Sequence, residues 1–293
     1  MSATSHRDDA TPLVSVVIPC RNGAATLGAQ LDAVLGQQAA WAFEVIVAND
    51  GSTDATAALV DAYAAHDDRV RRIEVTAPGG INAGRNQGVR AAAGSHLLLC
   101  DSDDVVRPGW LAAYVDAFAG GAQAVAGGLD FTLPNGREIV RHRRLFTFEL
   151  FARASPWGYG ANCGFTRAAF DAVGGFDERF TLGNDDIDFF IRLDEAGIAL
   201  VLVPEAVVTY YLRDGVRSLY RQHFNHGRAD VQFFMKWQGS GAVRPVLWSH
   251  PGSLRRALRY GARDVARRRD VIRIVAIHHG RIREAIARRV LCS

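Results

Sequence analysis

Polar and acidic side chains directly follow several short apolar runs near the start of the chain. Residues 19–23 (PCRNG) follow one run, residues 49–54 (NDGSTD) a second, and residues 101–104 (DSDD) another. The carboxylates of Asp101 and Asp103 offer hard oxygen ligands, which suit Mg²⁺ or Mn²⁺ held together with substrate phosphates. A single Asp-x-Asp is more often a turn or a helix cap. Several such clusters at the ends of strands favour one shared binding site.

Three further features have the chemistry of a substrate site. Asp50 can bind a nucleobase or ribose through its carboxylate, or it can be a turn residue before Gly51. Arg85 can pair with a diphosphate, because a guanidinium matches phosphate oxygens, or it can be a surface arginine. Residues 184–188 (NDDID) offer several carboxylates, which can also form the acidic first turn of a helix. The chain lacks both the phosphate-binding loop and the dinucleotide-binding glycine pattern.

The elements that must position these residues alternate between strand and helix. Apolar runs predict strands at residues 13–18, 43–48, 70–75 and 96–100, and helical periodicity predicts helices at 24–35, 54–65 and 84–93. Ser52 or Thr53 is the predicted cap of the second helix. This alternation indicates right-handed crossovers and a mainly parallel sheet flanked by helices, an α/β fold. Ligands bind such sheets beyond the carboxyl ends of the strands, where the polar clusters lie.

Four segments together resemble family 2 glycosyltransferases, which are inverting enzymes of the GT-A fold. They read SVVIPCRNGAATL, EVIVANDGSTDAT, NAGRNQGVRAAAGSHLLLCDSDD and GGFDERFTLGNDDIDFFIRL, and the resemblance covers residues 13–211. It implies a Rossmann-like, mainly parallel sheet of the GT-A type flanked by helices. The corresponding division of the chain is a flexible tail at residues 1–11, a GT-A domain at 12–215, and a basic, mainly helical region at 216–293.

The resemblance also implies roles for single residues. Those that match nucleotide-sugar-binding positions are Pro19, Arg21, Asn22, Asp50, Asn82, Arg85, Asp101 and Ser102. Asp101 and Asp103 match the metal-binding motif, with Asp103 as the direct ligand. Aligning Arg192 and Leu193 with the family makes Asp186 the base and Asp185 the acid before it, whereas the other register makes Asp185 the base. The aromatic side chains of residues 157–162 can stack on an acceptor sugar or simply pack.

The implied activity is metal-dependent sugar transfer with inversion. The donor is a nucleotide-diphospho-sugar, with UDP favoured, and the acceptor is a hydroxyl of a carbohydrate, a lipid-linked glycan or a small molecule in polysaccharide, glycolipid or other glycoconjugate synthesis. Mn²⁺ or Mg²⁺ neutralises the charge that develops on the leaving diphosphate. One alternative is a sugar-phosphate nucleotidyltransferase, which would carry a glycine-rich, lysine-containing signature near Pro19. Another is a non-catalytic module that binds nucleotide sugars.

Charge is unevenly distributed along the 293 residues. The chain has a net charge of +3, but residues 213–293 hold 18 Lys+Arg and only 5 Asp+Glu. Basic amphipathic helices predicted within residues 254–291 can lie on an anionic membrane surface, or pack with solvated arginines. Nucleic acid is not an expected partner, because no recognised binding motif accompanies the charge.

Composition bounds the class and the compartment. A hydrophobic content of 48% is typical of a globular chain, and four scattered cysteines predict neither a disulfide framework nor a zinc site. The chain shows no secretory signal pattern and no apolar run of about 18 residues. We therefore expect a cytoplasmic protein, or one attached to the inner face of the membrane.

Overall fold

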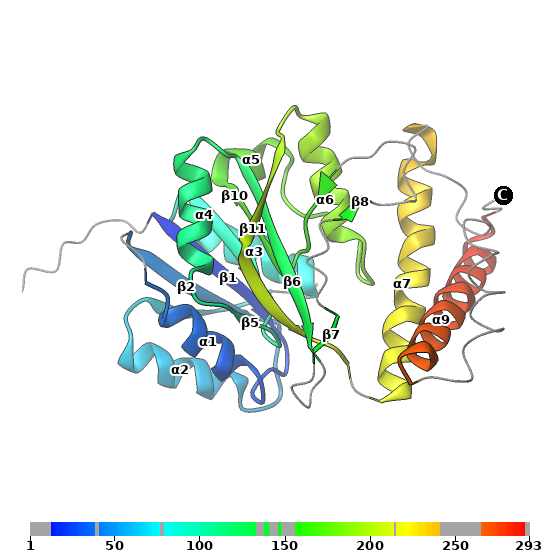
Figure 1. Ribbon diagram of the computed structural model, residues 1–293, viewed down its shortest axis with the longest axis horizontal. Helices are drawn as coiled ribbons and strands as arrows, with labels where there is room; N and C mark the ends of the chain where they lie inside the picture. The colour runs from blue at the N-terminus through cyan, green and yellow to red at the C-terminus, as the bar shows by residue number, and fades with distance from the viewer. Residues whose placement is uncertain are drawn as a thin grey trace, which may run out of the picture.

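The computed structural model describes residues 13–38, 41–76, 79–132, 138–140, 146–147, 156–213, 215–240 and 265–290. The predicted tail at residues 1–11 lies outside these residues, as does the start of the predicted basic helices, residues 254–264. A single large mixed sheet forms the centre of the molecule, and a pair of long helices stands beside it (Figure 1).

The first half of the sheet is parallel, as predicted. Its strands β1 (Val14–Cys20), β2 (Phe43–Asn49), β3 (Val70–Glu74) and β4 (His96–Cys100) pair in the order β3-β2-β1-β4. The helices α1 (Leu27–Leu35), α2 (Thr56–His66) and α3 (Ile81–Ala91) connect them. This order brings the polar residues after β1, β2 and β4 to one edge of the sheet.

The predicted cap of α2 at Ser52 or Thr53 is wrong. The residue before the helix is Ala55, which has no side-chain cap. Asp54 satisfies the helix start instead, because its carboxylate accepts a hydrogen bond from the Thr56 backbone N–H at 3.0 Å. The Ser52 hydroxyl accepts from the backbone N–H of Asn22, and so it links two loops.

The second half of the sheet adds antiparallel strands that the sequence did not indicate. Strand β10 (Asn162–Thr166) runs antiparallel between β4 and β6 (Ala124–Thr132), while β11 (Leu200–Tyr211) is parallel to β6. The short strands β5 (Val105–Val106) and β7 (Glu138–Val140) lie against β11 and β6, and β8 (Phe146–Thr147) pairs with β9 (Pro156–Trp157) separately. Because β10 runs backwards, Asn162 pairs with Cys100. The segment before β10 therefore reaches the same edge as the acidic end of β4.

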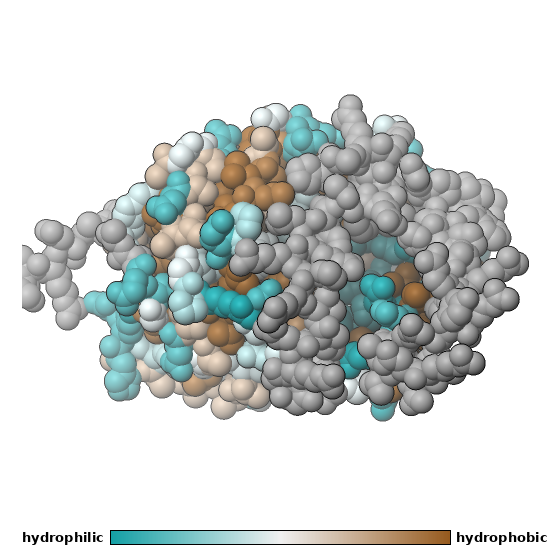
Figure 2. All heavy atoms as spheres, in the orientation of Figure 1, coloured by the Kyte–Doolittle hydropathy of each residue, from teal (hydrophilic) through white to brown (hydrophobic). Residues whose placement is uncertain are grey.

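Two cores cover the two faces of the sheet, because successive side chains of a strand point to opposite sides. In β1, Val16 and Ile18 pack with α1 and α4 (Trp110–Ala119), whereas Val17 packs with α3, α5 (Arg167–Ala172) and α6 (Asp185–Glu195). Apolar side chains reach the surface over β11 and β6, where Val201 is 41% exposed (Figure 2). The sheet is thus the middle of three layers, with helices packed on both of its faces. The polar clusters lie at the edge formed by the carboxyl ends of its parallel strands.

The C-terminal helices form a separate layer at one end of the molecule. Helix α7 (Val216–Trp237), followed by the short helix η1 (Gln238–Ser240), runs beside α9 (Val265–Arg288) in the same direction (Figure 1). A Cβ atom on Gly227 would lie 2.0 Å from the Ile277 carbonyl oxygen, and one on Gly280 would lie 2.0 Å from that of Phe224. These glycines let the two backbones touch. Among the helices described, none combines the length and apolarity needed to cross a membrane.

Candidate functional site

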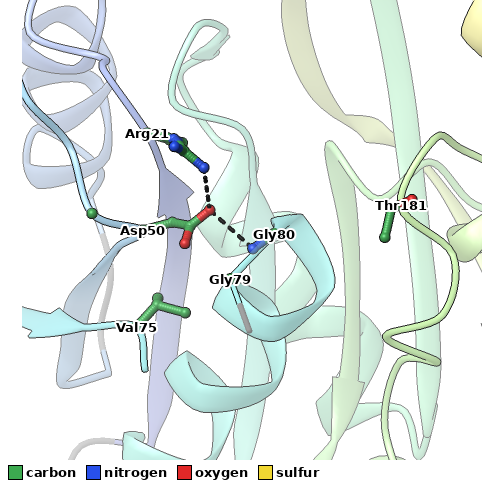
Figure 3. Close-up of a pocket in the computed structure, with 7 residues that line it drawn as sticks. Arg21, Asp50, Val75, Gly79, Gly80 and Thr181 are labelled. Carbon is green, nitrogen blue, oxygen red and sulfur yellow. Dashed lines mark hydrogen bonds and ion pairs between the residues drawn. The ribbon is translucent and has the colours of Figure 1, made fainter. Parts of the chain in front are cut away.

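An open pocket of about 420 Å³ lies beyond the ends of β1, β2 and β3 (Figure 3). Its lining comes from the loops after these strands, the start of α3 and the loop before α6, and comprises Arg21, Asp50, Gly51, Val75, Gly79, Gly80 and Thr181. Asp50 accepts a hydrogen bond from the Gly80 N–H at 2.9 Å, and Arg21 lies 3.7 Å from the same oxygen. The predicted pair Arg21 and Asp50 therefore meets at one wall of this pocket.

Two glycines make room for the Asp50 carboxylate. A Cβ atom on Gly79 would lie 2.0 Å from Asp50 Oδ1, so any larger residue there would push the carboxylate aside. Gly80 has a φ of +121°, which L side chains rarely adopt. The two glycines thus leave space for the Asp50 carboxylate, and the Gly80 N–H donates to one of its oxygens. The carboxylate also lines the pocket.

Pro19, Asn22 and Ser102, also predicted to bind the donor, lie around this pocket without lining it. Pro19 is buried beneath α3. A Cβ atom added to Gly84 of α3 would lie 3.2 Å from the Cβ of Pro19. Asn22, with a φ of 54°, accepts a hydrogen bond from the Thr53 N–H at 2.8 Å. Burial raises the pKa of the Cys20 thiol, and a hydrogen bond with the Ser102 hydroxyl offsets part of that rise.

The acidic segment after β4 gathers three carboxylates. Asp101, Asp103 and Asp104 each place an oxygen within 4.8 Å of the others. Asp104 is 1% exposed; its Oδ1 accepts from the Tyr211 N–H at 3.1 Å, and its Oδ2 has no hydrogen-bond partner. Burial raises the pKa of both Asp101 and Asp104, and repulsion from neighbouring carboxylates raises it further. Arg213 lies 3.2 Å from Asp103.

This cluster fits a divalent cation. Among the described residues, the buried Asp104 Oδ2 has no hydrogen-bond partner, and such an atom is costly unless something compensates it. Asp101 Oδ1 is also buried without a hydrogen bond, and Arg85 lies 3.5 Å from it. Three carboxylate oxygens are the donors that Mg²⁺ and Mn²⁺ prefer. Asp104 was not among the predicted ligands, although it adjoins the motif, because sequence does not reveal which aspartates turn inward.

Arg85 of α3 is buried at the centre of the site. It is 4% exposed, pairs with Asp185, lies 3.5 Å from Asp101, and donates to Asn82 Oδ1 at 3.3 Å. Burial alone lowers the pKa of Arg85, but Asp185 and Asp101 outweigh it and raise the pKa. One guanidinium therefore links the acidic end of β4 to the start of α6.

Asn82, predicted to bind the donor, is directed toward the protein interior. It is 2% exposed and donates to the carbonyls of Phe180 at 2.7 Å and Asp177 at 3.3 Å. One turn later, Asn86 donates to the Phe176 carbonyl at 2.9 Å and accepts from the Phe176 N–H at 2.8 Å. Both asparagines of α3 therefore hold the loop that precedes α6, a role that the spacing of the motif does not reveal.

The three aspartates at the start of α6 occupy different environments. Asp185 contacts Arg85, and Asp188 is fully buried between Arg192 Nε at 2.9 Å and Trp237 Nε1 at 3.0 Å. Asp186 is less buried than these two, and its described hydrogen-bond donors are two backbone N–H groups, those of Gly160 at 3.1 Å and Ile187 at 2.9 Å.

Asp186 has the protonation behaviour of a neutral-pH base. Burial and the neighbouring charge of Asp185 raise its pKa to about 7, whereas the two N–H donors and Arg85 act in the opposite direction. A base is most effective when its pKa lies near the working pH. The Gly160 N–H belongs to the segment 157–162, whose aromatic rings were predicted either to stack on an acceptor sugar or to pack within the protein. Trp157 and Tyr159 lie edge to face at 5.0 Å there.

Solved structures with the same architecture are glycosyltransferases. A mannosyltransferase from Pyrobaculum calidifontis, solved with GDP-Man and Mn²⁺, superposes with a TM-score of 0.70 at 21% identity, over 94% of this chain and 88% of that one. GalNAc-T7, solved with UDP, GalNAc and Mn²⁺, superposes with a TM-score of 0.56 at 17% identity, over 76% of this chain and 48% of that one. These similarities confirm the predicted GT-A fold.

Curated relatives agree with the fold. The succinoglycan biosynthesis protein ExoO of Rhizobium meliloti is 32% identical over 71% of this chain, and the match spans 63% of ExoO. The validoxylamine A glucosyltransferase of Streptomyces hygroscopicus subsp. jinggangensis is 34% identical over 70% of this chain and 56% of its own length. Glycosyltransferase AglE of Haloferax volcanii is 26% identical over 87% of this chain and 86% of its own length.

The family model described as "Glycosyl transferase family 2" matches residues 15–174, more than half of the chain. The match spans β1 from its second residue through β4, Asp50 and the acidic cluster. The chain belongs to glycosyl transferase family 2.

Proposed function

We propose that this protein transfers a sugar from a nucleotide-diphospho-sugar to an acceptor hydroxyl, with inversion at the anomeric carbon and with a divalent metal. The observation that carries the proposal is Arg85, whose guanidinium contacts both Asp101 and Asp185. It joins a metal-compatible carboxylate cluster to the helix that bears a base with a pKa of about 7. A donor diphosphate and an activated hydroxyl need these two features close together.

The donor nucleotide occupies the Asp50 pocket in this proposal. The free side of the Asp50 carboxylate accepts an N–H from the base, such as the N3–H of uracil, and the family resemblance makes UDP-sugars the favoured donors. Arg21, 65% exposed at the rim, is free to approach the ribose or diphosphate. Asp101, Asp103 and Asp104 would hold Mn²⁺ or Mg²⁺, which neutralises negative charge on the departing diphosphate when bound.

The protein's own part in the reaction falls to Asp186. Its ionised carboxylate takes the proton of the acceptor hydroxyl as the acceptor oxygen forms a bond to the anomeric carbon. The bond from that carbon to the phosphate oxygen breaks, and its electron pair leaves with the nucleoside diphosphate. A single displacement from the opposite face inverts the configuration. The neighbouring charge of Asp185 raises the proton affinity of Asp186, and Arg85, which pairs with Asp185, offsets part of that effect.

The acceptor is a carbohydrate, lipid-linked or small-molecule hydroxyl. The names of the relatives point to polysaccharide and small-molecule glycosylation in those proteins. We also propose that residues 12–215 form the catalytic domain and that residues 216–293 bring it to an anionic membrane surface at the cytoplasmic face. The net charge of +13 on residues 213–293, which hold 18 basic and 5 acidic side chains, supports this attachment.

A screen of nucleotide sugars by thermal shift, with and without Mn²⁺, tests the donor. A donor that binds the native state raises Tm, and the proposal expects the largest rise for a UDP-sugar with Mn²⁺. The best donor is then incubated with candidate acceptors and with water alone, and nucleoside diphosphate release is measured. Release of pyrophosphate from a nucleoside triphosphate would indicate a nucleotidyltransferase instead.

Two substitutions separate binding from chemistry in this assay. Asp186→Asn is expected to abolish turnover while donor-induced stabilisation remains, because the carboxamide cannot accept the proton. Asp103→Asn is expected to abolish the Mn²⁺-dependent part of the stabilisation. Full turnover in Asp186→Asn would contradict the assignment of Asp186 as the base. A wild-type protein that no nucleotide sugar stabilises would contradict the whole proposal.

A further inference from the structure

The residue directly before α6 is held in an unusual conformation by a distant helix. Asn184 has a φ of 61° and a ψ of 11°, the left-handed region that few residues other than glycine adopt. Its side chain does not cap α6. Instead, its Nδ2 donates a hydrogen bond of 2.9 Å to Asp230 Oδ1 in α7. A conformation of this kind persists where the surrounding structure enforces it.

Asp230 is itself held by the other C-terminal helix. It is 7% exposed, and its Oδ2 accepts from Nε and Nη2 of Arg281 in α9 at 2.8 and 2.6 Å. Arg281 is 5% exposed. Buried charges are costly unless they are paired and hydrogen-bonded, and here both oxygens of Asp230 are engaged. The contact therefore has one defined geometry that joins α9, α7 and the start of α6.

The same contact lies immediately before the candidate base. Asp185 and Asp186 follow Asn184, and the Asn184 carbonyl accepts the Asp188 N–H at 3.0 Å to close the first turn of α6. His226, one turn before Asp230, lies beside the preceding residue, because a Cβ on Gly183 would be 3.5 Å from its ring. Helix α7 thus packs against the backbone that leads into α6 and Asp186.

We propose that Asp230 is a positioning residue for sugar transfer: through Asn184 it sets the first turn of α6 and so the direction of the Asp186 carboxylate. The C-terminal helices then contribute to catalysis without touching the substrate. This inference rests on the proposed role of Asp186. It assigns the basic region a second task besides any membrane contact.

Two substitutions isolate the contact. Asp230→Asn removes the ion pair with Arg281 while keeping the size of the side chain. Asn184→Gly removes the hydrogen bond to Asp230 without backbone strain, because glycine adopts a φ of 61° freely.

The matched control is Glu284→Gln. Glu284 is 4% exposed and accepts from Arg228 at 2.7 Å, Arg288 at 2.6 Å and Gln232 at 3.3 Å, so it also joins α9 to α7. Its three side-chain partners belong to α7 and α9, and none to α6. Loss of general helix packing would therefore affect the control as much as Asp230→Asn.

The first readout is nucleoside diphosphate release from the nucleotide sugar that most stabilises the wild-type protein, with Mn²⁺. Misplacing a catalytic group by about 1 Å can cost on the order of 100-fold, so we expect kcat to fall about 10- to 100-fold in Asp230→Asn and Asn184→Gly. KM for the donor is expected to stay within about 2-fold, since the donor pocket is untouched, and Glu284→Gln is expected to keep kcat.

The second readout is hydrogen exchange at the amides of residues 185–188, which needs no substrate. We expect faster exchange in Asp230→Asn and Asn184→Gly, and wild-type exchange in Glu284→Gln. Unchanged protection in the first two variants overturns the inference, even if the wild-type protein shows no turnover.

The outcomes also separate this inference from the proposed function. If Asp186→Asn abolishes turnover while Asp230→Asn and Asn184→Gly keep wild-type kcat, the inference fails and the proposed function stands. An equal loss of kcat in Glu284→Gln would show a merely structural role and would overturn it as well. If Asp230→Asn does not fold, Asn184→Gly carries both measurements.

Discussion

Individual aspartates in this site differ because their surroundings differ. Asp177 pairs with Arg179 at 2.7 Å and Lys236 at 2.9 Å, and these partners hold its pKa well below the ordinary range. Within the part of the chain that the structure describes, the donors to Asp186 are backbone N–H groups, and burial together with Asp185 raises its pKa to about 7. Two carboxylates nine residues apart are thus driven in opposite directions. The partners and the burial of each carboxylate, not its residue type, therefore set its proton affinity.

The raised pKa of Asp186 predicts how activity depends on pH. The base must be ionised, so kcat/KM for the donor is expected to rise with pH and to reach half of its maximum near pH 7. The measurement is a pH profile of nucleoside diphosphate release. A profile that is flat between pH 5.5 and 8.5 in the wild-type protein would argue against Asp186 as the base.

The same shift predicts a stability effect of opposite sign. The folded-state pKa of about 7 lies above the ordinary value of 3.8, so the native state holds its proton more tightly than the unfolded chain. Stability is therefore greatest below pH 4 for this group and is lost as pH rises through 7. Asp186→Asn, which cannot ionise, is expected to raise Tm at pH 8 by about 2–6 °C without metal or nucleotide. The difference should vanish near pH 4, and a lower Tm at pH 8 would refute the shift.

Helix α7 contacts both α6 and the loop before it. Trp237 Nε1 donates to the buried Asp188 at 3.0 Å, and Lys236, the only lysine in the chain, bridges Asp177 and Asp188. Together with Asp230 these contacts hold both the loop before α6 and α6 itself. The helix α7 depends in turn on α9, against which it packs through Gly227 and Gly280.

The close crossing of α7 and α9 predicts the effect of small substitutions. Gly227→Ala places a Cβ 2.0 Å from a carbonyl oxygen of α9, so the helices must separate. We expect a loss of about 1–3 kcal/mol in the free energy of unfolding, although alanine is the better helix former by about 1 kcal/mol. Urea unfolding measures it. Gly239→Ala is the control, because nothing lies within 4 Å of its Cβ position. A stabilised Gly227→Ala would show that the helices do not touch there.

At the scale of the molecule, charge and architecture divide the chain at nearly the same place. The basic excess begins at Arg213, and α7 begins at Val216. Near its C-terminal end, α9 exposes Ile282 by 52% and Ile286 by 72%. Arg283 lies between these two residues in the chain, Arg289 directly follows the helix, and both arginines are exposed. Exposed apolar and basic side chains on one helix are typical of contact with an anionic membrane.

This surface predicts lipid selectivity. The protein is expected to co-float with vesicles that contain anionic phosphatidylglycerol at low salt, and to stay unbound with neutral phosphatidylcholine vesicles. Raising the salt to about 0.5 M should weaken binding, since the Debye length then falls to a few ångströms. The double substitution Arg283→Glu and Arg289→Glu should abolish flotation, with donor-induced stabilisation unchanged as the control. Equal binding to neutral vesicles, or none to anionic ones, would contradict the proposed attachment.

Much of this molecule could be predicted from local sequence. Periodicity located β1 to β4 and α1 to α3 within three residues of their bounds, because strand and helix patterns are set by neighbours in the chain. The position of Asp50, Asp101 and Asp103 after strands of a parallel sheet placed them at one edge, and the structure confirms that placement. Antiparallel β10 was not foreseen, since pairing with β4 joins residues more than 60 positions apart.

The partners of the buried side chains depended on the tertiary fold. Arg85, predicted either to bind a diphosphate or to be a surface arginine, is buried against Asp185, 100 residues away, and Asn82 holds a loop nearly as distant. No local pattern indicates that Asp104 turns inward or that Asp230 reaches Asn184, 46 residues earlier. Residue type and spacing determine which chemistry is available along the chain. Burial and long-range pairing decide which carboxylate keeps its proton, which loses it, and which one only positions another.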